Sequence, residues 1–474
     1  MAEEAKFRAT PDDDVDVVVG LDIGTTKVVA VVGQRDTATG KIKILGYGKT
    51  ESTGVMRGAV INIQTTAEAV KRAVEQASVA SNVDINEVYV GIAGQHIQSE
   101  VQEYTYVREN SDDVFTREEI ERLKVKVSHG TVPAGRKIIH VIPRTFSVDG
   151  AGGFTEDNIV GMVGANVNAV LNVITADAVA MRNIQRSVEM AGLDLIGFIL
   201  EPLVSAEAVL DESDKEAGVV LVDIGGGTTD VAIFMNGILT HTAVIPLAGN
   251  IITNDIKTGC TILPKQAEAL KVKFGSALPS ESSDEQIVSI PGLKGKTARE
   301  ISLKQLATII GARVGEIFSS VSCEIANCQC DLDHFIGGIV LTGGGAKMKH
   351  ISQVCEFHTQ LETRLGMPKE HITPDSPAEL ADPIYATAIG LVIYGVRSEE
   401  ENRIIHVAEH GQVAHVHQAE PQQPVVPETP VETAPAEPEE PEAKEGRKGG
   451  KKGGFTAATK LKDWIVGLFD DDIQ

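Results

Sequence analysis

The most constraining feature of this sequence is the stretch of residues 218–234, GVVLVDIGGGTTDVAIF. An apolar, β-branched run reaches Asp223, and then come three glycines, two threonines and a second apolar run. This order predicts a strand, a tight glycine turn and another strand. Glycine permits positive φ and the close approach of a ligand, and the N–H groups of such a turn form an anion site. Because an acid at its edge repels a bare anion, the stretch indicates a polyphosphate with Mg²⁺. A plain glycine hairpin is the alternative.

A second copy of this pattern lies near the start of the chain. Residues 15–32, VDVVVGLDIGTTKVVAVV, again run from an apolar strand through an acid, Asp22, to a glycine, a threonine pair and another apolar strand. Two such turns about 200 positions apart predict an internal duplication with one phosphate loop in each half. Lys27 follows the first turn and either reaches a phosphate as a point charge or is an ordinary solvated strand lysine.

Composition excludes some classes of protein. The chain has 474 residues, 42% of them hydrophobic, which is enough for two or more domains with their own cores. A net charge of −24 argues against binding to nucleic acid. The five cysteines follow no disulfide or zinc spacing and are expected to be buried or idle cytosolic thiols. The acidic N-terminus is unlike a signal peptide, and no apolar run approaches the length of a bilayer span. We therefore expect a cytosolic protein whose membrane contact, if any, is made from the surface.

Between the two glycine turns we expect two kinds of segment. Strands at 42–47 and 87–92 flank an alanine-rich helix at 65–80 that follows a threonine cap. The sequence from 100 to 161 is more polar, with a capping box at Thr116–Glu119 and a glycine-rich loop at 150–153. This stretch predicts a small α/β subdomain inserted into the first half.

Glu201 stands where a strand meets a helix. Pro202 follows it, and proline is favoured in the first helical turn. Glu201 can therefore project into a cleft, or it is simply a carboxylate favoured by the helix dipole.

The second half contains three further features. A helix at 264–274 carries Glu268 and Lys271 one turn apart, a spacing that is also typical of a surface pair. A long amphipathic helix is predicted at 298–323. Residues 336–348, IGGIVLTGGGAKM, give a third strand and glycine turn, and residues 383–394 read as a closing core helix.

The C-terminal segment has a different composition. Residues 418–446 hold seven prolines and eight glutamates against one lysine, which predicts a disordered linker without a core. Residues 455–474 then place bulky apolar side chains at three- and four-residue steps after a Gly–Lys segment. Such a helix is typical of membrane-surface binding, although a groove on a partner or on its own domain is an alternative. The residues expected at the membrane are Phe455, Leu461, Trp464, Ile465, Leu468 and Phe469, with Lys451 and Lys452.

Together, the two Asp–Gly–Thr turns, Glu201 and the third glycine turn resemble the actin–hexokinase–chaperone ATPase superfamily, over residues 15–397. Within it the sequence is most similar to the FtsA family of bacterial cell division proteins. The segments that carry this resemblance are GLDIGTTKVVAVVG, EVYVGIAGQHIQS, HVIPRTFSVDG, VVLVDIGGGTTDVAIF, IPLAGNIITNDI, AEALKVKFG, GIVLTGGGAKM and PIYATAIGLVIYG.

This resemblance implies an α/β, two-lobed actin-like ATPase fold with an inserted small α/β subdomain, a disordered linker and a C-terminal amphipathic helix. The corresponding boundaries are a tail at 1–14, the first lobe at 15–86 and 166–210, the insert at 87–165, the second lobe at 211–380 with a smaller subdomain at 261–334, a closing helix at 381–397, the linker at 398–454 and the amphipathic helix at 455–474.

The resemblance also implies roles for individual residues. Asp22 and Asp223 would hold Mg²⁺ through water, and Glu201 would orient the attacking water. The ATP phosphates would be held by Gly24, Thr25, Thr26, Lys27, Gly225, Gly226, Gly227 and Thr228. The nucleoside would be contacted by Glu268, Lys271, Gly344, Gly345 and Met348. The surface around Arg313 and Glu316 would bind the tail of the tubulin-like protein FtsZ.

In function, the resemblance implies an ATP-binding protein that forms filaments and anchors the FtsZ ring at the cytoplasmic face of the membrane at the division site. It would help to recruit later division proteins, with slow ATP hydrolysis as a switch. A chaperone would need a large substrate domain after the ATPase, a sugar or acetate kinase has no reason for a membrane tail, and an actin-like shape protein would lack the insert.

Overall fold

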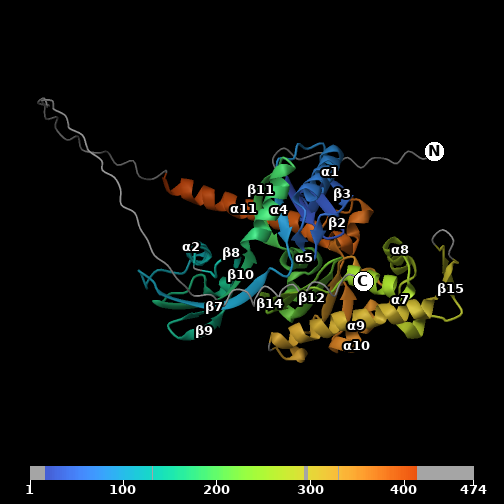
Figure 1. The fold of residues 1–474 in the computed structure, drawn as a ribbon. Helices are drawn as coiled ribbons and strands as arrows, with labels where there is room; N and C mark the ends of the chain where they lie inside the picture. Colours follow the sequence, from blue (N-terminus) through green and yellow to red (C-terminus); the bar gives the residue numbers. More distant parts are fainter. Residues whose placement is uncertain (1–15, 131, 293–296, 329, 414–474) are drawn as a thin grey trace, which may run out of the picture. The chain divides into compact units, whose positions relative to one another are not determined.

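The computed structural model describes residues 16–130, 132–292, 297–328 and 330–413. The predicted tail at 1–14 and the amphipathic helix at 455–474 lie outside these residues, as does the linker from residue 414 on. In the described part, two five-stranded sheets follow the same plan (Figure 1). The first has the order β11-β6-β1-β2-β3, and its strands are Asp194–Leu200, Glu87–Ile92, Val18–Ile23, Lys27–Arg35 and Ile42–Glu51.

The second sheet repeats this plan and confirms the predicted duplication. Its order is β14-β13-β12-β17-β18, and its strands are Ile238–Ile245, Thr229–Met235, Val219–Ile224, Ile339–Thr342 and Thr363–Leu365. In both sheets the predicted hairpin is antiparallel, β1 with β2 and β12 with β13. In both, a later strand then pairs in parallel with the first strand of the hairpin, β6 with β1 and β17 with β12.

Two helices lie between the sheets and share a hydrophobic core with both. These are α5 (Glu201–Val209) and α11 (Ala386–Val413). Side chains alternate along each central strand, so that Leu221 faces this layer while Val220 and Val222 face the outer helices of the second lobe. Burial on both faces explains why the strands read as continuous apolar runs. The other helices of the two lobes are α1 (Ile63–Ser81), α4 (Ala178–Met190), α6 (Glu212–Ala217), α7 (Gly249–Cys260), α8 (Pro264–Phe274), α9 (Leu303–Asn327) and α10 (Ile351–Thr359).

The contact between α5 and α11 depends on a glycine. A Cβ added at Gly390 would lie 1.8 Å from the carbonyl oxygen of Val204. We expect Gly390→Ala to lower the free energy of unfolding by about 3 kcal/mol, because the two backbones must move apart. Chemical denaturation measures this change. Gly197→Ala is the matched control, since its Cβ would meet nothing within 4 Å, and equal losses in both variants would contradict the packing argument.

The insert has its own sheet, core and helices. Its strand order is β7-β10-β8-β9, and the bounds are Gln98–Val107, Asn166–Asp177, Arg136–Val148 and Ala151–Phe154, with α2 (Arg117–Ser128) and α3 (Glu156–Ile159) packed alongside. The sheet does not coincide with the predicted boundaries of 87–165. β6 pairs with β1 and so belongs to the first lobe, whereas β10 pairs with β7 and β8 along its length. The glycine-rich loop predicted at 150–153 forms the turn into β9 and most of that strand.

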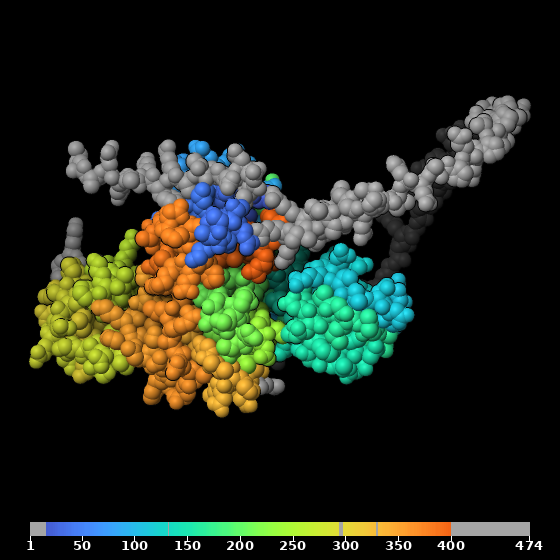
Figure 2. Space-filling view, turned by 180° about the vertical axis from the view of Figure 1, so that it is seen from behind, coloured from blue at the N-terminus to red at the C-terminus, as the bar shows by residue number. Residues whose placement is uncertain are grey.

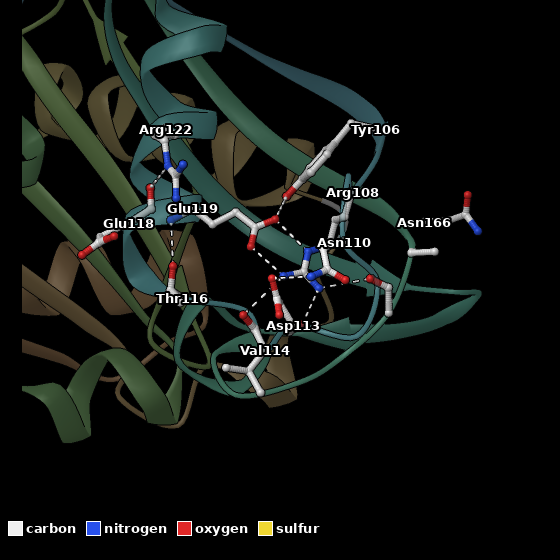
Figure 3. A network of polar contacts seen from close by, with 12 residues as sticks. Tyr106, Arg108, Asn110, Asp113, Val114, Thr116, Glu118, Glu119, Arg122 and Asn166 are labelled. Carbon is white, nitrogen blue, oxygen red and sulfur yellow. Dashed lines mark hydrogen bonds and ion pairs between the residues drawn. The ribbon is translucent and has the colours of Figure 1, made fainter. Parts of the chain in front are cut away.

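The predicted capping box in the insert is only half formed. Thr116 accepts a hydrogen bond from the N–H of Glu119 at 3.2 Å, but the Glu119 carboxylate pairs with Arg108 through two bonds of 2.8 and 2.9 Å (Figure 3). Arg108 also donates to the carbonyl oxygens of Asp113 and Gly164 and lies 4.0 Å from the centre of the Phe115 ring. This side chain therefore fastens the 108–116 loop to α2.

Three other boundaries differ from expectation. The cap of α1 is Asn62 rather than a threonine. Residues 299–302 form β16, which pairs with β15 (Ile287–Ile290), so that α9 begins at Leu303. The closing helix α11 continues from Ala386 to Val413, beyond the predicted end at 397, because the polar sequence there is rich in helix-forming residues.

By length and composition, α9 is apolar enough to cross a membrane, contrary to the expectation that no segment approaches this length. Its apolar side chains, including Ile310, Ile317 and Phe318, are buried in the core of the second lobe. A core helix passes the same test, and the burial of these side chains shows that α9 is a core helix of the second lobe.

Candidate functional site

A cavity of about 620 Å³ lies at the ends of β1 and β12. Its wall includes every residue that the sequence assigned to the nucleotide or to Mg²⁺. These are Asp22, Gly24, Thr25, Thr26, Lys27, Glu201, Asp223, Gly225, Gly226, Gly227, Thr228, Glu268, Lys271, Gly344, Gly345 and Met348.

The two glycine turns meet across this cavity. A Cβ on Gly226 would lie 2.4 Å from the methyl group of Thr26, and one on Gly227 would lie 2.4 Å from Oγ1 of Thr25. Glycine is thus required where the turns approach each other. The first N–H groups of α7, at Gly249 and Asn250, donate to the carbonyl oxygens of Gly225 and Gly226 at 3.1 and 2.8 Å. This helix start therefore holds the second turn in shape, a contribution that the sequence analysis missed.

The two predicted acids have different partners. Lys27 donates to Asp22 at 2.5 Å, so that the lysine is paired within the site and is not a solvated strand residue. Asp223 accepts hydrogen bonds from Ser205 on α5 at 2.8 Å and from Thr387 on α11 at 3.4 Å. The helical layer between the sheets therefore orients this carboxylate. Burial is the main cause that raises the pKa of Asp223.

Asp230 is a fourth carboxylate of the site that the sequence analysis did not single out. It lines the cavity, and β-sheet register places it directly opposite Asp223. It is 4% exposed, and its Oδ1 has no hydrogen-bond partner among the described residues. Burial, and then the charge of Asp223, raise the pKa of Asp230 well above its usual value. The sequence did offer a signal for Asp230, since it is an acid within the apolar run TDVAIF. An unpaired buried charge is costly, so that an acid in such a run indicates a functional role.

Glu201 is the first residue of α5 and points into the same cluster. A Cβ on Gly91 would lie 3.3 Å from its Oε1, which places the carboxyl group against β6. Burial raises the pKa of Glu201 well above its usual value, and the charges of Asp22, Asp230 and Asp223 raise it further. Four carboxylates thus gather at the base of the cavity with Lys27 beside them, an arrangement that favours a cation or a proton.

The far end of the cavity is less charged. Lys271 donates to the carbonyl oxygen of Gly249 at 2.9 Å and to Thr253 at 2.8 Å, and it pairs with Glu268 at 2.8 Å. Its role therefore includes joining α8 to α7, which is more than a surface pair. Val272 and Met348 add apolar surface to this part of the wall, and the buried side chains of Ile252, Val314, Ile317 and Phe318 lie behind it.

The third glycine turn forms the edge between these two ends. Gly343 has φ of +82°, and a Cβ there would lie 2.2 Å from Oδ1 of Asp223. A side chain at Gly343 would therefore disturb the carboxylate cluster directly. The turn continues into a short 3₁₀ helix at Gly345–Lys347.

No group of three His, Cys, Asp or Glu side chains in the described ranges is arranged to bind a metal directly. The contact of Asp22 and Asp223 with Mg²⁺ through water stays a prediction. Away from the cavity, Arg313 donates to Asp255 at 2.6 Å and also pairs with Glu316. The predicted membrane residues, from Lys451 to Phe469, lie outside the described residues.

The buried carboxylate opposite Asp223 gives a stability prediction. Since the pKa of Asp230 is raised in the folded protein, its charge destabilises the fold at neutral pH, and this effect vanishes as pH falls below the unfolded-state value of about 3.9. We expect Asp230→Asn to raise the Tm of the nucleotide-free protein by a few degrees at neutral pH, and by progressively less toward pH 4. Scanning calorimetry measures this shift. The exposed Asp84→Asn is the control, and a lower Tm for Asp230→Asn would contradict the argument.

Solved structures define the class of this fold. The PilM–PilN complex of type IV pilus biogenesis aligns with a TM-score of 0.58 and 14% identity, over 80% of this chain and 98% of the other. MreB 5 of Spiroplasma citri bound to AMPPNP aligns with a TM-score of 0.50 and 16% identity, over 83% and 99%. The two repeated sheets and the cavity between them are thus those of an actin-like ATPase fold.

Sequence relatives place the chain within this class. The family described as "Cell division protein FtsA" matches residues 220–390, and "SHS2 domain inserted in FTSA" matches residues 94–175. The cell division protein FtsA of Pseudomonas aeruginosa is 36% identical over 83% of this chain and 92% of its own length. Those of Escherichia coli K12 and Borreliella burgdorferi are 35% and 32% identical, over 81% and 82% of this chain and 91% and 93% of their own lengths. The chain belongs to the FtsA family of cell division proteins.

Proposed function

We propose that this division protein binds Mg²⁺–ATP in the cavity between its two repeated sheets. The observation that carries the proposal is that all sixteen nucleotide and Mg²⁺ residues expected from the sequence line this one cavity. The related fold of MreB 5 was solved with AMPPNP bound. ATP would supply a polyphosphate to the facing glycine turns, and its Mg²⁺ would offset part of the carboxylate charge.

Within the cavity each group has a distinct role under this proposal. Backbone N–H groups of the two turns would hold the phosphates, and Asp22 and Asp223 would hold Mg²⁺ through water. Glu201 orients the attacking water, and the apolar wall near Met348 holds the base. Hydrolysis is slow, and the bound nucleotide acts mainly as a marker of state.

Equilibrium titration of the full chain with ATP, with and without Mg²⁺, tests this binding. We expect tight binding that requires Mg²⁺ and competition by ADP. A chain that is folded by circular dichroism but does not bind ATP would contradict the proposed function.

We further propose that the chain forms filaments and attaches the FtsZ ring to the cytoplasmic face of the membrane at the division site, where later division proteins assemble. One amphipathic helix at 455–474 binds a bilayer reversibly. A filament that presents many copies converts weak sites into stable attachment through effective concentration. The membership of the FtsA family and the apolar stripe in the tail sequence support this proposal.

The FtsZ tail would bind near Arg313 on α9. Arg313 is held by Asp255 and Glu316 but keeps an exposed edge, with 23% of its side chain accessible. We expect Arg313→Glu to weaken the binding of an FtsZ tail peptide about tenfold, the effect of losing one partly exposed ion pair. Fluorescence anisotropy with a labelled peptide measures it.

Lys304→Glu is the matched charge reversal on the same helix, since Lys304 is half exposed and pairs with Asp284. An equal loss of affinity in both variants would indicate a general charge effect. Unchanged affinity in Arg313→Glu would remove this surface from the proposal.

A further inference from the structure

Side chains on one face of the inserted sheet form hydrogen bonds with both lobes. His140 on β8 accepts a hydrogen bond from the N–H of Leu200 at 3.1 Å, and Asn172 on β10 donates to the carbonyl oxygen of Leu239 at 2.6 Å. Leu200 ends β11 of the first lobe, and Leu239 lies on β14 of the second lobe. The insert is therefore joined by side-chain hydrogen bonds to each of the two sheets that enclose the cavity.

These two side chains share one face of the insert. Register pairs Asn172 with Ile142 and Ile174 with His140, and residues 140 and 142 point to the same side of a strand. Ile142 packs against the core that surrounds α5 and α11, and the His140 ring meets the Tyr394 ring edge-on at 6.4 Å. Figure 1 places β8 and β10 beside β14, and Figure 2 shows the cyan-to-green surface of the insert against the light green segment that follows residue 200. β8 thus lies against a strand of each lobe, β11 and β14.

The hydrogen bond to His140 comes from the backbone N–H that lies between the end of β11 and the start of α5. β11 is an edge strand of its sheet, so that its outer N–H groups have no neighbouring strand. Leu200 is also the residue before α5, and this helix start has no side-chain cap. Glu201 follows directly, and Ser205, one turn later on the same side of α5, holds Asp223. The position of the first turn of α5 thus affects two carboxylates of the cavity.

The imidazole suits this acceptor role. Burial lowers the pKa of His140 to about 4, so that the ring is neutral at physiological pH. A neutral ring that accepts at Nε2 carries its proton on Nδ1.

We propose that the face formed by His140, Ile142 and Asn172 acts as a brace between the lobes, with His140 as a positioning residue for Glu201. The role in hydrolysis rests on the proposed ATP site, whereas the mechanical role does not. Through this brace, anything that bends the inserted sheet would move the carboxylate that is expected to orient water.

Two substitutions of His140 separate positioning from packing. His140→Leu fills similar space without an acceptor, whereas His140→Gln keeps a polar group near the place of Nε2. His129→Leu, which changes an exposed histidine of the same subdomain, is the control. Hydrogen exchange of the peptide around Leu200, ATP affinity, single-turnover hydrolysis and Tm are measured on the full chain.

For His140→Leu we expect exchange at Leu200 to quicken and hydrolysis to slow, each by about tenfold, the effect of losing one net hydrogen bond. ATP affinity should stay within about twofold, because the turns themselves are unchanged. His140→Gln should recover most of both losses, and His129→Leu should behave as the wild type.

A second variant tests the other anchor. Asn172→Leu removes the bond to Leu239. A single brace predicts that adding this substitution to His140→Leu slows hydrolysis little further, because either break disconnects the insert from one of the two lobes. Independent, additive losses would contradict a shared brace.

The remaining outcomes are also decisive. Unchanged exchange at Leu200 in His140→Leu would overturn the proposal, and so would equal losses of rate and Tm in the Leu and Gln variants. If the wild type does not bind or hydrolyse ATP, the proposed function fails, and exchange at Leu200 alone still decides whether the brace exists.

Discussion

Replacing Asp223 by Asn should reduce the requirement for Mg²⁺ in ATP binding and weaken the affinity for Mg²⁺–ATP about 100-fold. Asp223 would hold Mg²⁺ through water, and the loss of its charge accounts for a change of this size. The amide keeps the shape of the carboxylate and can still accept from Ser205 and Thr387, which hold Asp223 in place. The loss is therefore one of charge and not of packing.

Asp223→Asn should change the affinity for Mg²⁺–ATP and the affinity for ATP without Mg²⁺ in opposite directions. ATP without Mg²⁺ is repelled by the four carboxylates, so that Asp223→Asn should bind it more tightly than the wild type does. Isothermal titration with and without Mg²⁺ measures both changes, with Asp84→Asn as an exposed control. Wild-type affinity for Mg²⁺–ATP in Asp223→Asn would remove this turn from the site.

Truncation after Gly454 should abolish binding to vesicles that contain anionic lipid. The truncated chain keeps Lys451 and Lys452 but loses the apolar stripe from Phe455 to Phe469. Lysines near a surface contribute about 1 kcal/mol each and are screened by salt, whereas buried apolar side chains add about 1.5–3 kcal/mol each. We therefore expect affinity for vesicles to fall at least about 100-fold in vesicle flotation.

Two substitutions in the full chain refine this experiment. Trp464→Glu should release the protein from vesicles, while Trp464→Phe should retain most binding, because the ring buries similar apolar area. Persistent flotation of the truncated chain on anionic vesicles would rule out a membrane role for residues 455–474. If the truncated chain still binds ATP, as we expect, the two functions reside in separate parts of the sequence.

The local pattern of the sequence was sufficient to predict the glycine turns and most central elements. The strand at 87–92, the helix at 264–274 and the start of α5 at Glu201 agree with the structure. Each is determined by neighbours in the chain, through alternation, helical spacing or a proline in the first turn. The resemblance to a known family supplied the set of residues that the structure then brings together around one cavity.

Features that depend on pairing between distant segments were not predictable in this way. Asp230 becomes part of the site only because register places it opposite Asp223. The boundaries of the insert depend on which sheet β6 and β10 join. β6 joins the sheet of the first lobe and β10 joins the sheet of the insert, but the local sequence of each predicts only a strand. The bonds of His140 and Asn172 likewise join segments 60 and 67 positions apart.

The length of α11 connects the cavity to the rest of the chain. Thr387, in its first turn, contacts Asp223, and the same helix continues to Val413. At 1.5 Å per residue, the helix carries the chain about 40 Å from that carboxylate before the tail sequence begins. A tilt of a few degrees at the first turn would displace the far end by several ångströms. A tilt of α11 caused by a change at the phosphate site would therefore shift the position at which the tail sequence begins.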